Sequence, residues 1–453
     1  MQVRIKPYKG PVGGWGSVKG VTEILLREAI PLKGSLALWH QNKPGGFACV
    51  SCSYGRPPDL SAFEFCENGA KATAWEITDR RCPPAFFAEH TVTELESWSD
   101  LQLEEVGRLT EPMRWDSVSD RYVPISWADA FAAIGAALKD LTPKSVVFYA
   151  SGRASLEASY MYQLLARMYG NNNLPDSSNM CHESTSVALP QTIGVPVGTV
   201  KIEDFEHTDC VMFFGQNVGV NSPRMLHQLQ EVRERGVPII TFNPLRERGL
   251  ESFTNPQSPI EMLTLSETKI STQYHQLQPG SDLAVLVGMS KALLAMDDEA
   301  KAAGTGRAID VDFIDQDTSG FDAFVASMNH FQWPEIEACS GLSRGAIESA
   351  ARVSQRQGRY RLLRHGPDPA PFGGTRDSDA EQFAAHARQH RQDRGRHFSG
   401  ARPFECPGPA HGRDHGKARA RPLDRLAEQY GFNPPRERGL DTVGTCEAVR
   451  DGA

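Results

Sequence analysis

The sequence predicts an α/β protein with a doubly wound parallel sheet and more than one domain. From about residue 126 onward, short apolar runs typical of buried strands alternate with amphipathic helical segments. The chain has 453 residues, which exceeds one ordinary hydrophobic core and indicates about two to four domains. Hydrophobic residues make up 40% and charged residues 23% of the sequence, a balance typical of a globular protein.

The first element of this alternating region is predicted to be an amphipathic helix. Ser126 is a residue type that caps helices, because its hydroxyl can accept a hydrogen bond from a backbone amide in the first turn. The residues that follow place an apolar side chain every three or four positions. The expected apolar face includes Trp127, Phe131, Ile134 and Leu138.

Strands and helices then follow in a repeating order. Residues 145–150 are apolar and β-branched and are predicted to form a buried parallel strand. A helix is expected over residues 156–169. Two further strands are predicted at 210–214 and 237–242, with a helix after Pro223 between them. This spacing favours a parallel sheet joined by helical crossovers.

Polar and glycine residues follow two of the predicted strands. Gly215 and Asn217 follow the strand at 210–214, and Asn243 follows the strand at 237–242. Ligands bind doubly wound sheets at the carboxyl ends of their strands, which makes these segments candidate ligand loops. Glycine, asparagine and proline are also the usual residues of ordinary turns, so that alternative stays open here.

The most informative local feature is a Cys-x-x-Cys pair, Cys49 and Cys52, followed by Cys66 and Lys71. Two cysteines three positions apart can direct both sulfurs at one point with little backbone strain, which suits a metal ion or an iron–sulfur cluster. The surrounding sequence is rich in glycine and proline, as in loops that wrap metals. A redox-active dithiol, or no site at all, are the alternatives.

A second candidate is the adjacent pair Cys181 and His182. The residues after Cys181 can begin a helix, and a helix N-terminus stabilises a thiolate. The imidazole next to it could donate a proton or a hydrogen bond. A buried cysteine beside a surface histidine is the alternative.

Composition excludes several classes of protein. A formal net charge of −8 gives no reason to expect a nucleic-acid partner. The first residues lack the apolar segment of a signal peptide, and no run reaches the ~18 apolar residues of a membrane-spanning helix. The nine cysteines are irregularly spaced and odd in number, unlike a disulfide framework. The expected setting is the cytoplasm.

Together, these segments resemble a known family, the alpha subunits of molybdopterin oxidoreductases in the formate-dehydrogenase-like branch of the DMSO reductase superfamily. The resemblance covers residues 1 to about 355 and resumes near Pro422. Its specificity comes from the order and spacing of the segments rather than from any one of them. They are residues 10–16, the Cys49 and Cys52 pair, 63–71, 179–183, 214–217 with Pro223, and 278–284.

The resemblance implies a DMSO-reductase-like multi-domain fold with a small N-terminal iron–sulfur domain. Relatives continue well beyond the segment that matches the end of this chain, so we expect the C-terminal domain to be missing and the chain to be truncated. The expected organisation is an iron–sulfur region at 1–110, α/β molybdopterin-binding domains at 111–355, an anomalous segment at 356–421 and a resumed family segment at 422–453.

The resemblance also implies an iron–sulfur centre. Cys49, Cys52 and Cys66 correspond to ligands of a [4Fe-4S] cluster, and Cys82 is a weaker candidate for the fourth ligand. Members of the superfamily often have a short gap before the third cysteine, whereas here Cys66 is thirteen residues after Cys52. Lys71 resembles the lysine between cluster and pterin in relatives, and a plain surface lysine is the alternative.

Residues near the expected molybdenum are assigned by the same resemblance. Cys181 corresponds to the cysteine or selenocysteine that ligates molybdenum, and His182 to a histidine used in proton transfer. Loops that bind the phosphates of a bis-molybdopterin guanine dinucleotide would use backbone amides. These loops contain Gly215, Asn217, Asn243, Gly280 and Asp282. Asp282 could pair with guanine nitrogens, and the alternative is that it only caps a helix.

One stretch departs from this pattern. Residues 365–422 contain no Ile, Leu, Val or Met and are rich in Arg, His, Gly, Pro and Ala. Such a composition cannot bury enough apolar surface to offset its ordering entropy. A disordered linker and a histidine-rich metal tract are two explanations. We favour a third, that two compensating frame changes altered the translated sequence, because GC-rich codons read out of frame yield these residues.

The expected function is therefore that of a molybdenum-dependent oxidoreductase alpha subunit. It would act on a small-molecule substrate, with formate suggested by analogy, and pass electrons through the cluster to a redox partner protein or carrier. The alternative is a non-catalytic remnant that binds only an iron–sulfur cluster or zinc through Cys49 and Cys52.

Overall fold

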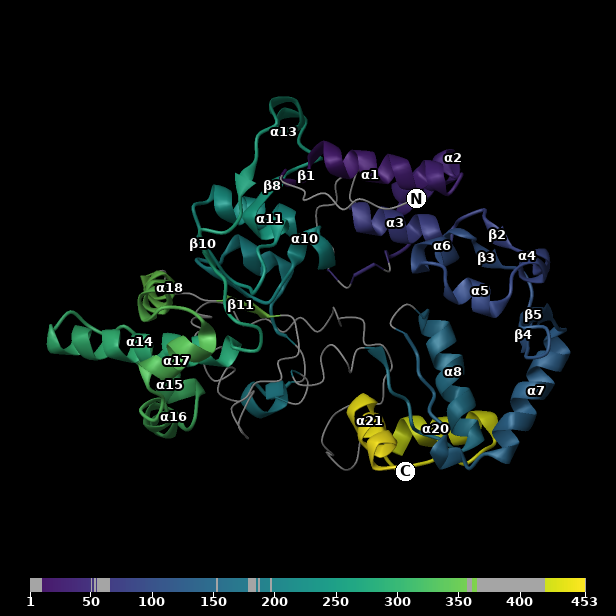
Figure 1. Ribbon diagram of the computed structural model, residues 1–453. Coiled ribbons are helices and arrows are strands. Elements are labelled where there is room, and N and C mark those ends of the chain that lie inside the picture. Colours follow the sequence, from purple (N-terminus) through teal and green to yellow (C-terminus); the bar gives the residue numbers. More distant parts are fainter. Residues whose placement is uncertain are drawn as a thin grey trace. The chain divides into compact units, whose positions relative to one another are not determined.

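The chain forms two compact units, each built from segments that are far apart in the sequence. Unit 1 comprises Met1–Val18, Cys52–Ser61 and Met180–Glu405, and unit 2 comprises Lys19–Ser51, Ala62–Asn179 and Cys406–Ala453 (Figure 1). The computed structural model describes residues 10–49, 51–52, 54, 66–151, 154–177, 185, 188–195, 198–356, 361–364 and 420–452. The domain boundaries expected from the sequence stay predictions.

Unit 1 contains a parallel four-stranded sheet. Its strands are β6 (Val211–Phe214), β7 (Ile239–Phe242), β10 (Gln273–His275) and β11 (Arg361–Arg364), in the spatial order β10-β7-β6-β11. The strands predicted at 210–214 and 237–242 are thus confirmed. Successive strands β6, β7 and β10 extend in one direction, and β11 lies on the other side of β6. The point where strand order reverses is therefore between β6 and β11.

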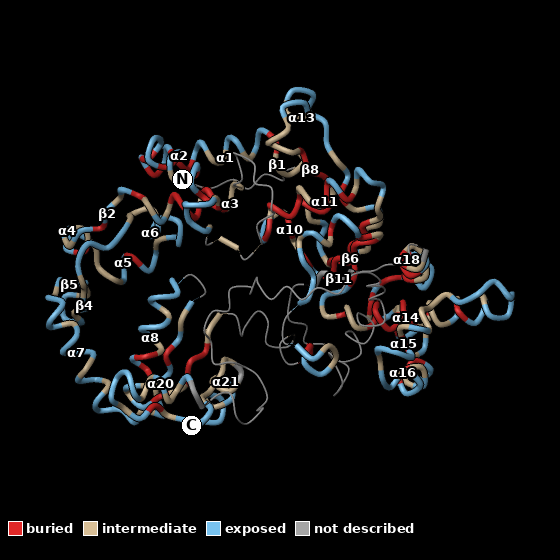
Figure 2. Tube along the Cα trace, turned by 180° about the vertical axis from the view of Figure 1, so that it is seen from behind, coloured by how far each residue is buried: buried red, intermediate tan, exposed pale blue. Residues whose placement is uncertain are grey.

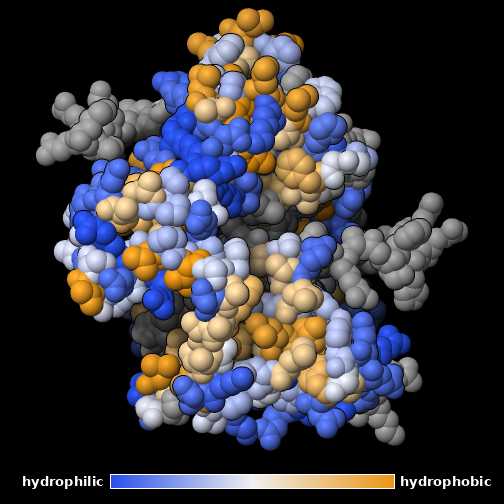
Figure 3. Space-filling model, turned by 90° about the vertical axis from the view of Figure 1, so that its right-hand side faces the viewer, coloured by the Kyte–Doolittle hydropathy of each residue, from blue (hydrophilic) through white to orange (hydrophobic). Residues whose placement is uncertain are grey.

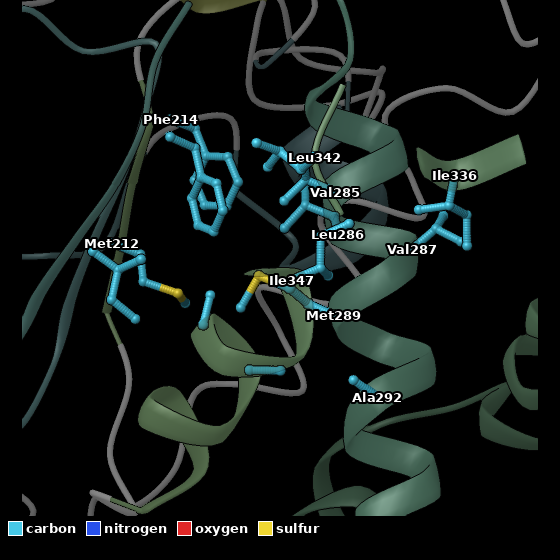
Figure 4. Packing of buried hydrophobic residues seen from close by; sticks show 14 of the residues in the cluster. Met212, Phe214, Val285, Leu286, Val287, Met289, Ala292, Ile336, Leu342 and Ile347 are labelled. Atoms are coloured by element: carbon cyan, nitrogen blue, oxygen red, sulfur yellow. The ribbon is translucent and has the colours of Figure 1, made fainter. Parts of the chain in front are cut away.

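Both faces of the sheet are covered, which explains why its central strands are apolar throughout. In β6, Val211 and Phe213 pack into one buried cluster with residues of α11 (Met225–Glu234). Met212 and Phe214 pack into the other. In that second cluster, side chains of β6 face Val285, Leu286 and Met289 of α14 and Ile347 of α18 (Figure 4). Red segments in Figure 2 mark these buried strands.

Helices on the α14 side form the larger buried cluster. The longest, α14, begins directly after the loop that contains Gly280. The helices that contribute to it are α14 (Asp282–Ala302), α16 (Phe321–Met328), α17 (Trp333–Ser340) and α18 (Arg344–Arg356). Helix α15 (Val311–Asp317) lies between α14 and α16 in the sequence.

Short elements surround the other face and the sheet edge. A small three-stranded sheet joins β1, β8 and β9, and α10 and α12 follow β6 and β7. Their bounds are β1 (Val12–Gly13), η2 (Ile202–Glu206), α10 (Val218–Asn221), α12 (Arg248–Glu251), β8 (Ser252–Thr254), α13 (Pro259–Thr264) and β9 (Thr268–Lys269). Helix α1 (Gly14–Arg27) begins in unit 1 and ends in unit 2.

Unit 2 is mainly helical and contains two helices that were predicted from the sequence. Helix α7 (Trp127–Asp140) is capped by Ser126, whose hydroxyl accepts from the amide of Asp129. Helix α8 (Leu156–Tyr169) is capped by Ser155. Its other elements are α2 (Pro31–His40), α3 (Glu67–Glu76), β2 (Arg81–Cys82), α4 (Pro84–Glu89), α5 (Val92–Glu96), α6 (Asp100–Glu105), β3 (Arg108–Leu109), β4 (Met113–Asp116), β5 (Arg121–Pro124), η1 (Pro143–Ser145), α20 (Ala420–Tyr430) and α21 (Thr442–Asp451).

The strand predicted at residues 145–150 is wrong. Only Ala150 forms a bridge, to Asp176; Ser145 ends the short helix η1, and residues 146–149 belong to no strand. The carbonyl of Val146, which a sheet ladder would use, instead accepts hydrogen bonds from the side-chain amides of Asn171 (2.7 Å) and Asn173 (3.0 Å). Asparagine side chains compete with sheet pairing in this way.

Most of the apolar face predicted for α7 is exposed, and Leu138 is half-buried. Trp127 and Phe131 are each 64% exposed and Ile134 is 58% exposed. Figure 3 shows that apolar residues, in orange, lie among polar ones on the face in view. Among all the helices that the structure describes, none is long and apolar enough to cross a bilayer.

Candidate functional site

Two of the three candidate cluster cysteines lie together at the start of α3. Cys66 is the N-cap residue of this helix, and Cys49 lies in the loop after α2. A Cβ atom on Gly69 would lie 3.0 Å from Cys49 Sγ and 3.6 Å from Cys66 Sγ. Both sulfurs therefore lie beside the same backbone position, and any side chain larger than glycine would crowd them.

Backbone amides point at both sulfurs. The Ser51 amide donates to Cys49 Sγ and the Gly69 amide to Cys66 Sγ, each at 3.4 Å. Amide hydrogens directed at sulfur stabilise a thiolate, as does a helix N-terminus, and the thiolate is the form that binds metals. These two half-buried cysteines therefore have surroundings that suit metal-bound thiolates.

Two buried amide side chains border the cysteines. The Cys49 amide donates to Asn42 Oδ1 at 3.0 Å, which holds the start of the cysteine loop. Gln41 is fully buried, and its Nε2 donates to the Gly69 carbonyl at 3.0 Å and to Thr73 Oγ1. Its Oε1 would also be 3.0 Å from a Cβ on Gly69 and has no hydrogen-bond partner. Sequence reasoning missed both residues, because amides in a turn carry no motif.

The hydrophobic packing of α3 fixes this arrangement. Ala70 and Ala74 are fully buried against Ile24 and Ile30, with Leu38 of α2 in the same cluster. Small alanines let α3 approach its neighbours closely, so the N-terminus of the helix is held where the cysteine loop ends. The position of Cys66 thus follows from the core of unit 2.

The other candidates of this region are less closely connected with the two sulfurs. Cys52 belongs to unit 1, and its predicted role as a ligand stays a prediction. Cys82 is buried with Phe87 and Leu95, and burial raises the pKa of its thiol, which disfavours the thiolate that a ligand needs. Lys71 forms an ion pair with Glu67 at 2.6 Å. Across the described ranges, no group of three His, Cys, Asp or Glu side chains is arranged to hold a metal ion.

In unit 1, the candidate loops after β6 and β7 lie beside each other. Asn243 is buried, and its Nδ2 donates to the Gln216 carbonyl at 3.3 Å, while its Oδ1 accepts from the Leu245 amide at 3.1 Å. Gly215 has a left-handed conformation with φ +64°, which glycine adopts without strain, and Asn217 begins α10. The structure thus brings Gly215, Asn217 and Asn243 together at the carboxyl edge of the sheet.

An aromatic stack that sequence reasoning missed supports this edge. Phe214, Phe242 and His275 are the last residues of β6, β7 and β10, and their rings stack with centroids 4.7 Å and 5.1 Å apart. Burial lowers the pKa of His275, which therefore stays neutral at neutral pH. The stack holds three strand ends at one level, so the loops that leave them start from a rigid platform.

The third candidate loop lines a pocket of about 270 Å³ at the start of α14. Gly280, with φ +80°, turns the chain into the helix, and Ser281 is the buried N-cap residue. Asp282 is the first residue of α14 and does not line the pocket. The pocket is lined by Gln278, Pro279, Gly280, Ser281, Leu283, Ala284, Ala338 and Cys339.

The pair Cys181 and His182 lies outside the residues that the structure describes, so their predicted roles stay predictions. The same holds for the stretch 365–419 within the segment predicted to be out of frame, whereas residues 361–364 form β11 beside β6.

Comparison with known proteins identifies the family. The sequence matches the molybdopterin oxidoreductase family over residues 108–385, more than half of the chain. The chain belongs to this family. The expected resemblance to molybdopterin oxidoreductases is thereby confirmed, as is a mixed α/β architecture. The family's description implies a molybdenum–pterin cofactor for its members.

Individual relatives agree with this assignment. The chain is 42% identical over its whole length to protein YdeP of Escherichia coli, strain K12, and covers 60% of that protein. It is 33% identical over 99% of its length to the uncharacterized oxidoreductase Rv2900c of Mycobacterium tuberculosis, of which it covers 58%. It is also 25% identical, over 51% of its length, to a formate dehydrogenase alpha subunit of Methanococcus maripaludis, of which it covers 30%. The chain therefore spans about 60% of the length of the first two relatives.

Proposed function

We propose that this chain is the cofactor-binding part of a molybdenum-dependent, formate-dehydrogenase-like oxidoreductase alpha subunit. The full protein would carry out two-electron chemistry at a bis-molybdopterin guanine dinucleotide centre and transfer electrons through a [4Fe-4S] cluster to a redox partner. The observation that carries the proposal is the convergence of Cys49 and Cys66 sulfur beside Gly69, each with a backbone amide directed at it.

Each end of the proposed electron path has residues suited to it. Cys49, Cys52 and Cys66 would supply thiolates to the cluster. Lys71, on the same helix as Gly69, would place a cation between cluster and pterin once its pairing with Glu67 rearranges. When bound, the molybdenum–pterin group supplies a metal that accepts and releases two electrons.

The loops at the carboxyl edge of the sheet in unit 1 would hold the nucleotide part of the cofactor. Backbone amides of the segment from Gly215 to Asn217 would donate to phosphate oxygens, and buried Asn243 keeps that segment in place. The Gly280 loop, with its pocket, would take a further part of the same group. Asp282 would accept from guanine nitrogens.

Cys181 would ligate the molybdenum through its thiolate, and His182 would hold the proton released from substrate. A soft thiolate suits a metal that cycles between high oxidation states, and imidazole is the side chain that most readily gains and loses a proton near neutral pH. Formate is the substrate that we propose, since one relative is named a formate dehydrogenase subunit.

Metal analysis tests the proposal. A version that spans the full length of the relatives, purified without oxygen, should contain molybdenum, iron and acid-labile sulfide, and should reduce a dye with formate. Iron or zinc without molybdenum would support a non-catalytic remnant instead. Molybdenum and iron without formate oxidation would leave the family chemistry standing and exclude formate.

A further inference from the structure

Helix α7 of unit 2 has an apolar stripe that the described part of the chain leaves largely exposed. Trp127, Phe131, Ile134 and Leu138 are spaced by four, three and four residues, which places them on one side of the helix. The first three are 64%, 64% and 58% exposed, and none of the described residues of α7 is buried (Figure 2). A helix in a protein gains most of its stability by packing such a stripe against a partner.

Helix α8 of the same unit has a second exposed stripe. One side of α8 is buried, but another presents Met161, Leu165 and Met168, which are 61%, 51% and 55% exposed and are again spaced by four and three residues. The hydroxyl of Tyr169, the last residue of α8, donates to the carbonyl of Leu138 at 2.6 Å. The ends of the two helices are thus joined, and each helix leaves an apolar side unpacked.

We propose that the exposed stripes of α7 and α8 are the docking surface for a further part of the same polypeptide, one that the longer relatives possess. The chain covers 60% of protein YdeP and 58% of Rv2900c, so about 40% of each relative has no counterpart here. The occupant would be an apolar helix or sheet face from that remainder. Contiguous exposed apolar side chains of this size are typical of surfaces that another protein segment covers.

Unit 2 already packs a late segment of the chain against an early one. Residues 420–452 belong to the same unit as α7 and α8, although they are far away in the sequence. Asn172, just after α8, donates through Nδ2 to the carbonyls of Pro435 and Glu437, each at 2.8 Å. Gly439 permits this close approach, because a Cβ there would collide with the Asn172 backbone. Late segments therefore reach unit 2 beside the end of α8.

The charges of the two helices argue against a lipid surface as the occupant. Helix α7 carries Asp129, Lys139 and Asp140, and α8 carries Glu157 and Arg167. Helices that lie on a membrane have a polar face rich in lysine and arginine. Few charges of both signs beside an apolar stripe are better suited to packing against protein.

Variants of α7 test the proposal in two forms of the protein, the 453-residue chain and a version that spans the full length of the relatives. Phe131→Gln/Ile134→Gln makes the stripe polar with a residue that favours helices. Ala136→Gln is the matched control, because Ala136 is nine residues, or about two and a half turns, beyond Trp127 and so lies on the opposite side. The measurements are urea unfolding by circular dichroism, amide hydrogen exchange of residues 127–140, and light scattering.

The two forms should respond differently. In the 453-residue chain, the double variant should keep its unfolding midpoint within about 0.2 M of wild type, because substitutions at exposed positions have small effects. In the full-length version it should lower the midpoint by about 1 M or more, because the new polar groups would be buried. Wild-type amides of residues 127–140 should exchange about tenfold more slowly in the full-length version, and Ala136→Gln should match wild type in both forms.

Several results would overturn the proposal. Equal midpoints of the double variant and wild type in the full-length version would do so, as would equal exchange of residues 127–140 in both forms. An equal fall in Ala136→Gln would show that the loss does not belong to the apolar stripe. A dimer of the 453-residue chain that the double variant converts into a monomer would make a second copy the occupant. Where the double variant fails to fold, Ile134→Gln alone supplies the comparison. None of these measurements depends on metal content, so failure of the proposed function leaves this inference standing.

Discussion

Replacing Gly249 with alanine should destabilise unit 1 at the edge of its sheet. Gly249 in α12 faces Gly219 in α10, and the two helices follow β7 and β6 respectively. A Cβ on Gly249 would lie 2.5 Å from Gly219 Cα and 2.8 Å from its nitrogen. Carbon atoms in contact normally lie about 3.5–4.0 Å apart, so one backbone must move by roughly 1 Å.

The size of the effect follows from this shift. Overpacking that forces a backbone to move costs about 1–3 kcal/mol. For a urea m-value of about 2–3 kcal/mol per molar, the unfolding midpoint should fall by about 0.3–1.5 M. Because α10 starts directly after the loop of Gly215 and Asn217, the same shift should displace a candidate cofactor loop.

Urea unfolding followed by circular dichroism measures the effect. The matched control is Gly345→Ala in α18 of the same unit, where a Cβ would meet nothing within 4 Å. Alanine favours helices over glycine by roughly 0.5–1 kcal/mol, so the control should be unchanged or slightly more stable. An unfolding midpoint for Gly249→Ala equal to or above that of wild type would refute the close packing of α10 and α12.

Three further predictions concern two buried groups and the proposed catalytic pair. Burial alone would raise the pKa of Asp297, but hydrogen bonds, led by the one from Arg307, hold this pKa well below its usual range. Asp297→Ala should therefore lower the free energy of unfolding at pH 7 by about 2–4 kcal/mol, and the loss should shrink in strong acid, as urea titrations at several pH values would show. Equal stability of the variant and wild type at pH 7 would contradict this prediction. Burial lowers the pKa of His275 below the ~6.5 of the unfolded chain, so stability should fall as pH drops below about 6.5, and His275→Gln should flatten the dependence of the urea midpoint between pH 7 and 5. In a version that spans the full length of the relatives, Cys181→Ala should abolish nearly all dye-linked turnover, and His182→Ala should slow that turnover by about 10²–10⁴-fold. Wild-type rates in both variants would mean that neither residue is at the metal.

The parts of the fold that the sequence predicted well have local signals. Strand β6 is apolar at every position because both of its faces are buried. Helix α8 begins after a capping serine, Ser155, and ends at Gly170, whose left-handed conformation stops it. Such signals depend on neighbouring residues alone and need no tertiary information.

Other elements depend on contacts between distant residues. The run at 145–150 has the composition of a strand, but Asn171 and Asn173 bind the backbone carbonyl of Val146, and no local pattern shows this. Strand β10 contains Gln273 and His275, polar residues that pair only because β7 lies beside them. Short strands of this kind are added by tertiary packing.

The candidate site divides in the same way. The Cys-x-x-Cys spacing and Cys66 predicted a site in this loop, which stays a prediction; the structure places Cys66 and Cys49 together beside Gly69. The burial of Gln41 and Asn42 and their hydrogen bonds beside the cysteines depend on tertiary packing, which the sequence alone does not reveal. The fold, and not the local sequence, brings these hydrogen-bonding side chains beside the candidate cysteines.

Iron and acid-labile sulfide in the anaerobically purified chain test the central claim most directly. The arrangement of Cys49 and Cys66 beside Gly69 predicts both elements in wild type, broad visible absorbance, and their loss in the Cys49→Ser/Cys66→Ser double variant. Cys339→Ser, a cysteine of the pocket in unit 1, is the control and should keep them. Full iron and sulfide content in the double variant would contradict the claim that these two sulfurs bind the cluster.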